Sequence, residues 1–112
     1  MAKIDWPFGP ADVVALTATG AQAINIENRM TIIDGVTVAA TGNRTLNLTI
    51  DEEISIGAIL VVKSKTASTE RTIFGTGMSG VTITGVAGKT KVTTFVYDGT
   101  SFVEVATPIQ ID

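Results

Sequence analysis

The stretch KVTTFVYDGTSFVEV, from Lys91 to Val105, holds two apolar-rich runs on either side of an Asp-Gly dipeptide. In the first run Phe95 and Tyr97 stand two residues apart, and this alternation is the signature of a half-buried β-strand. Asp and Gly both tolerate positive φ angles, so Asp98-Gly99 predicts a hairpin turn. The alternation also puts both rings on one face, which favours a place in the core for them.

The same pattern recurs along the rest of the chain. Val, Ile and Thr are abundant, and β-branched residues pack well on a pleated sheet. Turn signals separate the runs by about 8 to 12 residues, and one of them, Asp34-Gly35, is a second hairpin candidate. The longest apolar run, Ala58 to Val62, fits a buried strand. The other alternating runs are Ile24/Ile26, Val36/Val38, Leu46/Leu48/Ile50 and Val81/Ile83.

Together these signals predict an all-β fold. We expect a single β-sandwich or jelly-roll-like barrel of about eight mostly antiparallel strands. The only helical candidate, Asp51 to Ile56, is too short for more than one turn. We assign residues 1–12 to an extended N-terminal arm and residues 13–112 to the β-sandwich domain.

The arm differs from the rest of the chain because it combines two prolines with the sole tryptophan. Pro7 and Pro10 keep the backbone extended and out of a central strand. Two alternatives remain open for Trp6 and Phe8: they fold over their own domain, or they dock on a neighbouring chain. Trp6, Pro7 and Phe8 are therefore the candidate docking residues.

Composition excludes several classes of function. The 112 residues carry a net charge of −3 and no basic stripe, so we expect no nucleic-acid partner. The sequence contains neither cysteine nor histidine, which removes the usual nucleophiles, general bases and zinc ligands. We therefore predict no enzymatic activity, no metal and no cofactor. The chain shows no membrane-spanning run and no signal peptide, so we expect no membrane partner and synthesis in a cytoplasm.

One short motif, GVAGKT from Gly85 to Thr90, uses the residues of a phosphate-binding loop. Such a loop needs a glycine five residues before the Gly-Lys pair and a helix after it. Ile83 occupies that glycine position, and a strand-like sequence follows from Lys91. We interpret GVAGKT as a turn whose lysine, Lys89, faces water.

The acidic cluster from Asp51 to Glu53 is the other candidate for chemistry. Two carboxylates can hydrolyse glycosides when they face each other across a cleft. Neighbouring residues in a surface turn are usually solvated instead, and one carboxylate can cap a short turn. The solvated interpretation is favoured.

Tyr97 and Phe102 flank the Asp98-Gly99 turn and offer an alternative function. If both rings were exposed, they could form a platform on which a sugar stacks. The two residues are therefore the candidate ligand-binding or interface residues, although alternation favours the core for Tyr97.

The order of segments between Thr45 and Val105 resembles a β module of tailed-bacteriophage virion proteins, of the head decoration, head fibre or tail fibre type. The resemblance lies in TLNLTI followed by an acidic turn, in IGAILVVK, in the Gly-rich hairpin and in the closing FVYDGTSFVEV. Members of that group often have Trp where this chain has Phe102.

The resemblance implies a non-enzymatic virion component that forms a homotrimer and docks on the particle, with a capsid or tail protein as partner. It implies that a short N-terminal segment attaches to the particle, and residues 1 to 12 would suit that role. We expect a structural protein of the virion, made in the host bacterial cytoplasm. The alternative is a receptor-binding module at a fibre tip, with a glycan as ligand.

Overall fold

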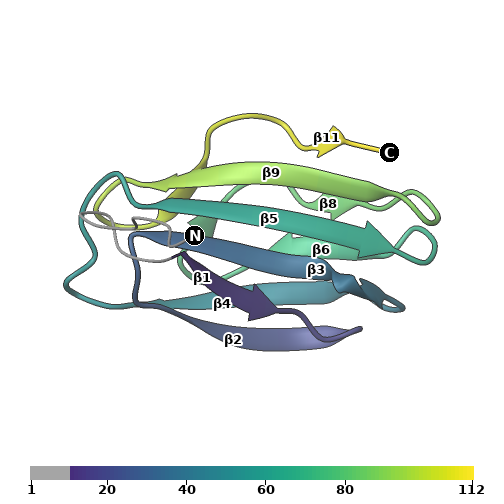
Figure 1. Ribbon diagram of the computed structural model, residues 1–112, viewed down its shortest axis with the longest axis horizontal. Helices are drawn as coiled ribbons and strands as arrows, with labels where there is room; N and C mark the ends of the chain where they lie inside the picture. The colour runs from purple at the N-terminus through teal and green to yellow at the C-terminus, as the bar shows by residue number, and fades with distance from the viewer. Residues whose placement is uncertain (1–10) are drawn as a thin grey trace, which may run out of the picture.

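The computed structural model describes residues 11–112, which form eleven β-strands and no helix (Figure 1). The predicted all-β fold is confirmed. Three strands are only two residues long, so eight longer strands remain, as the turn signals predicted. The strands are β1 (Asp12–Ala15), β2 (Gly20–Ile26), β3 (Met30–Ala40), β4 (Arg44–Ile50), β5 (Ile59–Thr66), β6 (Arg71–Phe74), β7 (Met78–Ser79), β8 (Ile83–Thr84), β9 (Thr90–Tyr97), β10 (Phe102–Glu104) and β11 (Ile109–Gln110).

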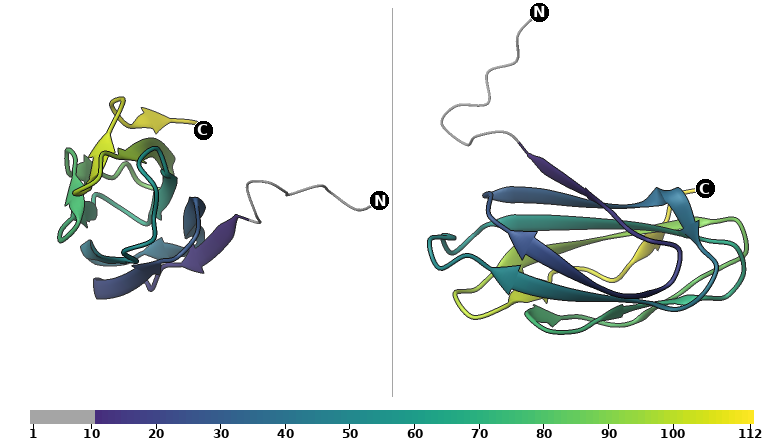
Figure 2. Two further views of the ribbon diagram at one scale, coloured as in Figure 1. Left: turned by 90° about the vertical axis from the view of Figure 1, so that its left-hand side faces the viewer. Right: turned by 90° about the horizontal axis from the view of Figure 1, so that it is seen from below.

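The strands form two sheets that face each other across a common interior (Figure 2). Sheet A has the order β1-β3-β5-β9-β10-β7, and β11 also pairs with β9. Sheet B has the order β2-β4-β6-β8. The first strand of sheet A begins at Asp12, and the predicted docking residues Trp6, Pro7 and Phe8 lie outside the described residues.

From β1 to β6 the chain changes sheet at every connection. Neighbours in a sheet are therefore two elements apart in sequence, and β1, β3 and β5 run parallel, as do β2, β4 and β6. Within residues 11–112, five of the nine strand pairings are parallel, which corrects the expected mostly antiparallel arrangement. Alternation has the same period in both arrangements, and a turn signal does not say in which sheet the next strand lies.

The two Asp-Gly dipeptides have different roles. Asp98-Gly99 makes the predicted hairpin between β9 and β10: Gly99 has a φ of 101°, and the Asp98 N–H donates to the Ser101 carbonyl (3.1 Å). The hairpin predicted at Asp34-Gly35 is wrong, because β3 continues through it to Ala40. A side chain at Gly35 would place its Cβ 2.6 Å from the Lys63 carbonyl oxygen and 2.8 Å from Arg44 Nη2. This glycine therefore permits a close approach and makes no turn.

The group approaching Gly35 is the guanidinium of Arg44, which is 2% exposed. Its two terminal nitrogens donate five hydrogen bonds, all to neutral oxygens. Burial lowers the pKa of Arg44, while the charges of Asp34 and Glu70 oppose this shift. One end of the interior is thus polar. The acceptors are the carbonyls of Thr17, Gly35, Val38 and Lys65 and the hydroxyl of Ser64.

The rest of the interior is mainly apolar, although the threonines Thr31 and Thr93 are also buried in it. Phe95, predicted to lie in the core, is fully buried and meets Phe74 edge to face, with ring centroids 4.8 Å apart. Leu48 and Leu60 belong to the same cluster and come from opposite sheets. Burial of each such side chain contributes about 1.5 to 3 kcal/mol to folding. This core fixes which side of each sheet faces outward.

Candidate interaction surface

The side chains that sheet A turns away from sheet B are mostly aliphatic. Because neighbouring strands are in register, these side chains form rows across the sheet. One row contains Val13, Ile32 and Val61; a second contains Met30, Ile59 and Val96. We call this surface the aliphatic face. Its further members are Val36, Val92, Ile109 and Ile111, together with the polar residues Asp34, Lys63, Lys65, Thr90 and Thr94.

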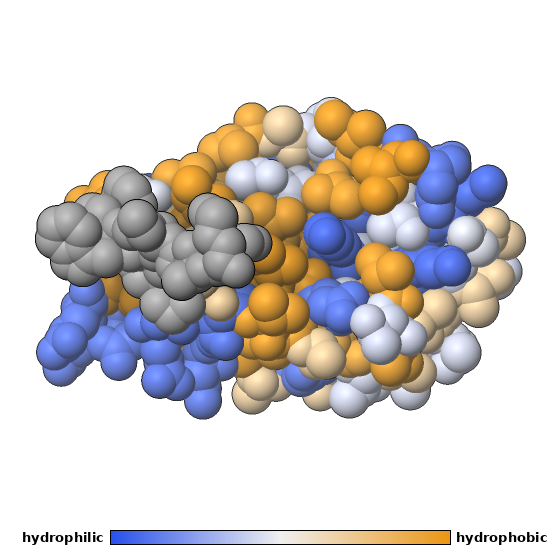
Figure 3. Space-filling view, viewed as in Figure 1, coloured by the Kyte–Doolittle hydropathy of each residue, from blue (hydrophilic) through white to orange (hydrophobic). Residues whose placement is uncertain are grey.

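Many members of the aliphatic face are open to solvent. Val13, Ile109 and Ile111 are each more than 60% exposed, and Ile59 is 40% exposed. Figure 3 views this side of the molecule and shows hydrophobic residues gathered across it, with a few hydrophilic ones between them. Contiguous apolar patches on a soluble domain mark interaction sites more often than single exposed residues do.

A shallow groove of about 470 Å³ lies in the aliphatic face. Four strands and the end of the chain contribute to it, because β11 lies along β9 on the side away from β5. Its lining is apolar on several sides and carries one carboxylate and one ammonium group. The lining residues are Val13, Ile32, Asp34, Val36, Thr37, Lys63, Thr90 and Ile111.

Asp34 is the acidic group of this groove and is held in a fixed position. Its Oδ1 accepts hydrogen bonds from the N–H groups of Val36 (2.9 Å) and Thr37 (3.1 Å), and its Oδ2 accepts one from Thr37 Oγ1 (2.6 Å). The Thr37 hydroxyl bond above all, with the two N–H bonds, holds the pKa of Asp34 below its ordinary value. Lys63 is its register partner on β5 and lowers that pKa further. The groove thus contains an ionised carboxylate at neutral pH.

The outer face of sheet B has the opposite character. Its rows on β2 and β4 consist of small and polar side chains, with Asn47 in the middle of β4, and one row ends in Ile73 on β6. The Asn47 Oδ1 accepts a hydrogen bond from the Thr76 N–H (3.0 Å), and Asn43 accepts one from the Arg71 N–H (2.9 Å). We call this surface the polar face. Its main members are Ala21, Ala23, Asn25, Thr45, Asn47 and Thr49.

The two residues of the predicted sugar platform lie side by side but differ in exposure. Phe102 is fully buried, so its ring cannot stack on a sugar, and that prediction is wrong for this residue. Tyr97 is half-buried, and its hydroxyl donates to the Gly99 carbonyl (3.0 Å). The two rings lie 5.2 Å apart inside the hairpin. Phe102 pairs with Tyr97, so its side chain lies on the same inner side of sheet A as Phe95. The apolar run at Phe102 was too short to predict this orientation from the sequence.

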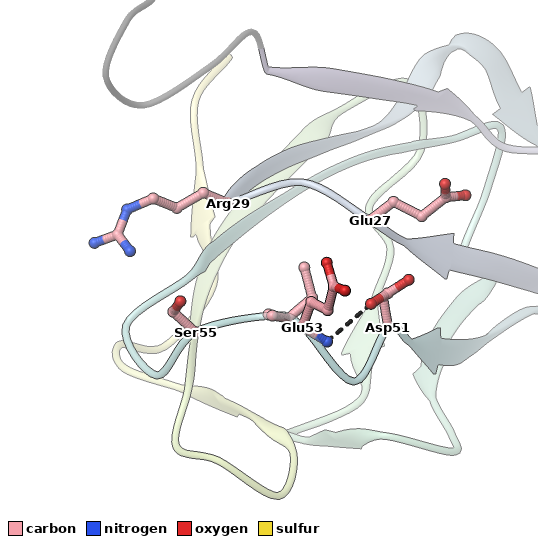
Figure 4. A pocket seen from close by; sticks show the side chains of 6 residues that line it. Glu27, Arg29, Asp51, Glu53 and Ser55 are labelled. Atoms are coloured by element: carbon pink, nitrogen blue, oxygen red, sulfur yellow. Dashed lines mark hydrogen bonds between the residues drawn. The ribbon is translucent and has the colours of Figure 1, made fainter.

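The acidic cluster is a solvated turn. Asp51, Glu52 and Glu53 are all exposed, and Asp51 Oδ1 accepts a hydrogen bond from the Glu53 N–H (2.8 Å). A small hollow beside it is lined by Glu27, Arg29, Asp51, Glu53, Ile54 and Ser55, and in Figure 4 the Arg29 side chain extends away from the carboxylates. Among residues 11–112, no three acidic side chains form a group that could hold a metal ion.

The motif GVAGKT forms the predicted turn. The Lys89 N–H donates to the Val86 carbonyl (2.9 Å), Gly88 has a φ of 69°, and β9 begins at Thr90. The Lys89 side chain is exposed, as expected. A strand follows this turn where a phosphate loop requires a helix.

Sequence reasoning missed the aliphatic face, although a signal for it exists. In the run Ala58 to Val62 both alternating sets are apolar, yet within one subunit only Ala58, Leu60 and Val62 are buried. Ile59 and Val61 point outward. A strand with two apolar faces predicts a cover on each side, and residues 11–112 supply a cover on one side only.

Comparisons of the chain with protein-family models, with curated proteins and with solved structures found no match. Within residues 11–112, no helix is long and apolar enough to cross a membrane.

Proposed function

We propose that this protein is a structural assembly subunit that acts without catalysis, by packing its aliphatic face against another subunit. The particle it builds is, by the resemblance of Thr45 to Val105, a tailed-bacteriophage virion. In that particle the chain serves as a capsid decoration or fibre-type subunit, associates with copies of itself and docks on a capsid or tail protein.

The observation that carries the proposal is the uncovered aliphatic face. Parallel sheets are normally covered on both sides, because exposed aliphatic rows cost free energy in water. Sheet A is parallel from β1 through β3 to β5, and sheet B covers only its inner side. Burial of this face in an interface would stabilise the assembly by roughly 25 cal/mol for each Å² of apolar surface removed from water.

Symmetric self-association fits this surface well. A closed oligomer covers the apolar face of every subunit with one kind of contact. The face lies on the strands of one sheet, so the rigid backbone presents its side chains in fixed positions. Such preorganised surfaces lose little conformational entropy on binding.

The carbohydrate-binding alternative now rests on Tyr97 alone. A stacking platform requires an exposed aromatic ring, and the Phe102 ring is in the core. No second aromatic side chain of the described residues lies beside Tyr97 on the surface. The assembly function is therefore favoured.

The test compares one substitution on each face. Ile59→Glu places a charge on the aliphatic face, between Met30 and Val96, whereas Ala23→Glu places the same charge on the polar face. We expect the unmodified chain and Ala23→Glu to sediment as oligomers at micromolar concentration, and Ile59→Glu to sediment as a folded monomer. Circular dichroism checks that both variants fold. A monomeric unmodified chain, or equal behaviour of the two variants, would contradict the proposal.

A further inference from the structure

The groove in the aliphatic face has the properties of a binding site for one aromatic side chain. Its volume, about 470 Å³, lies within the range of roughly 300 to 1,000 Å³ that is usual for ligand pockets. Val13, Ile32 and Ile111 supply apolar walls. Asp34 supplies a hydrogen-bond acceptor beside them, which a purely aliphatic ligand would leave unused.

Asp34 has room for one more donor. A carboxylate offers about four acceptor positions, and its contacts with Val36 and Thr37 fill three. An indole has a large apolar surface and a single N–H donor, which matches a groove with apolar walls and one open acceptor position. A phenylalanine ring would leave the acceptor position empty.

The chain contains one tryptophan, and it precedes the aliphatic face directly in sequence. Ile4, Trp6 and Phe8 alternate with Lys3, Asp5 and Pro7 in the segment before β1. On an extended backbone this period would place the three apolar side chains on one side. The segment could then lie along an aliphatic sheet face as an amphipathic strand does.

The prolines and the position of β1 favour a neighbouring copy over the same chain. Pro7 and Pro10 bias the residues before them to extended conformations. β1 is the edge strand of sheet A, with β3 as its partner. The segment joins β1 at Asp12, beside Thr31, whereas the β3 residues of the groove lie further along that strand, from Ile32 to Thr37. Ten extended residues span up to about 33 Å, which is enough to reach another subunit.

We infer that Trp6 of one copy occupies the groove of a neighbouring copy, with its indole N–H donating to Asp34. This inference rests on the proposed self-association and names the contact that holds it. Ile4 and Phe8 then pack on the aliphatic rows on either side of the groove. Each subunit both donates a segment and accepts one, so the contact repeats around a closed ring.

The experiment uses the fluorescence of Trp6, which reports on its surroundings without a label. Val36→Lys fills the groove with a charged side chain but leaves Trp6 in place, whereas Trp6→Ala leaves the groove intact and removes the fluorophore. In a mixture of the two variants all tryptophan emission comes from Val36→Lys. We expect this emission to be that of a solvated indole alone and to move to shorter wavelength when Trp6→Ala is added in excess.

The control is Val86→Lys, which changes a valine of similar exposure (43%, against 36% for Val36) in the turn before β9. We expect this variant to keep the short-wavelength emission of the unmodified oligomer. We also expect Trp6→Ala to weaken self-association by roughly 30-fold or more, as the loss of a central tryptophan does in other interfaces.

Three results would overturn the inference, and each differs from failure of the proposed function. An oligomer in which Trp6 has solvated emission would show that the function stands without this contact. Short-wavelength emission that persists on dilution to monomers would place Trp6 on its own domain. An unchanged emission in the mixture would exclude exchange between copies. A chain that is monomeric at every concentration would instead overturn the proposed function.

Discussion

The two outer faces of this protein belong to similar sheets but differ in composition. Both sheets are built around three parallel strands, and both are covered by the other sheet on the inside. On the outside, sheet B presents mostly alanine, asparagine and threonine, with Ile73 as the exception, and Asn47 and the adjacent Asn43 accept hydrogen bonds from neighbouring backbone N–H groups. Sheet A presents valine and isoleucine with few side-chain contacts of their own.

The difference shows that the fold does not dictate the aliphatic face. The polar face is the outer side of a parallel sheet built mostly from small and polar side chains, so nothing in the architecture requires exposed isoleucine on the other side. Exposed valine and isoleucine cost free energy in the isolated subunit, and their presence on this face is explained if another molecule covers them. Exchanging side chains between the faces therefore tests the interpretation.

The largest effect is expected when the aliphatic face is made to resemble the polar one. The triple variant Val13→Thr, Ile59→Thr, Ile111→Thr should weaken the free energy of association by about 3 to 4 kcal/mol, because less apolar surface is buried. This corresponds to a loss of roughly 100- to 1,000-fold in affinity. Subunit stability should change little, because all three side chains are exposed. Sedimentation equilibrium measures the first quantity and urea unfolding the second. Threonines at Ala21 and Ala23 serve as the control and should leave association unchanged.

A smaller effect is expected on the polar face, where a substitution should lower stability and leave association unchanged. Asn47→Ala removes the acceptor of the Thr76 N–H and should lower the free energy of unfolding by about 1 to 2 kcal/mol, without changing association. Thr49→Ala is the matched control, on the same strand and the same face. Equal stability of the two variants, measured in urea, would show that the polar face is not structural.

The smallest effect concerns the carboxylate of the groove. Because the folded state holds the pKa of Asp34 below 3.8, its contribution to stability is present above that pH and is lost as the pH falls through the lowered pKa. Asp34→Asn keeps an acceptor for the Val36 N–H but does not titrate. At pH 7 the unmodified chain should unfold at a slightly higher urea concentration than Asp34→Asn, and this difference should be smaller at pH 3. A difference that is independent of pH would mean that the charge of Asp34 does not stabilise the fold.

Much of the fold follows from local patterns in the sequence. Alternation places Phe95, Leu46 and Ile24 in the core, and the Asp98-Gly99 hairpin depends on a positive φ at Gly99 that few other residues tolerate. Parallel pairing could not be predicted from such signals, because it depends on which sheet the chain enters after each turn. Gly35 shows the same limit, since a glycine that makes room for a side chain resembles a glycine that makes a turn.

The candidate site was harder to predict. Arg44 lies in a surface-like sequence, and its burial depends on carbonyl groups from several distant segments. The aliphatic face was visible only indirectly, as a run from Ala58 to Val62 with no polar side. The docking residues Trp6, Pro7 and Phe8 lie outside the described residues and remain a prediction.

The parallel pairing has a consequence for the order of events on the ribosome. Asp12 pairs with Thr31, and Met30 pairs with Ile59, so each strand waits for a partner that is translated about 20 to 30 residues later. Arg44 likewise finds its last acceptors only when Ser64 and Lys65 have left the exit tunnel. The nascent chain therefore cannot settle hairpin by hairpin. It must hold β1 and β2 unpaired until β3 and β4 arrive, and chaperone demand should be greatest while these strands are being translated.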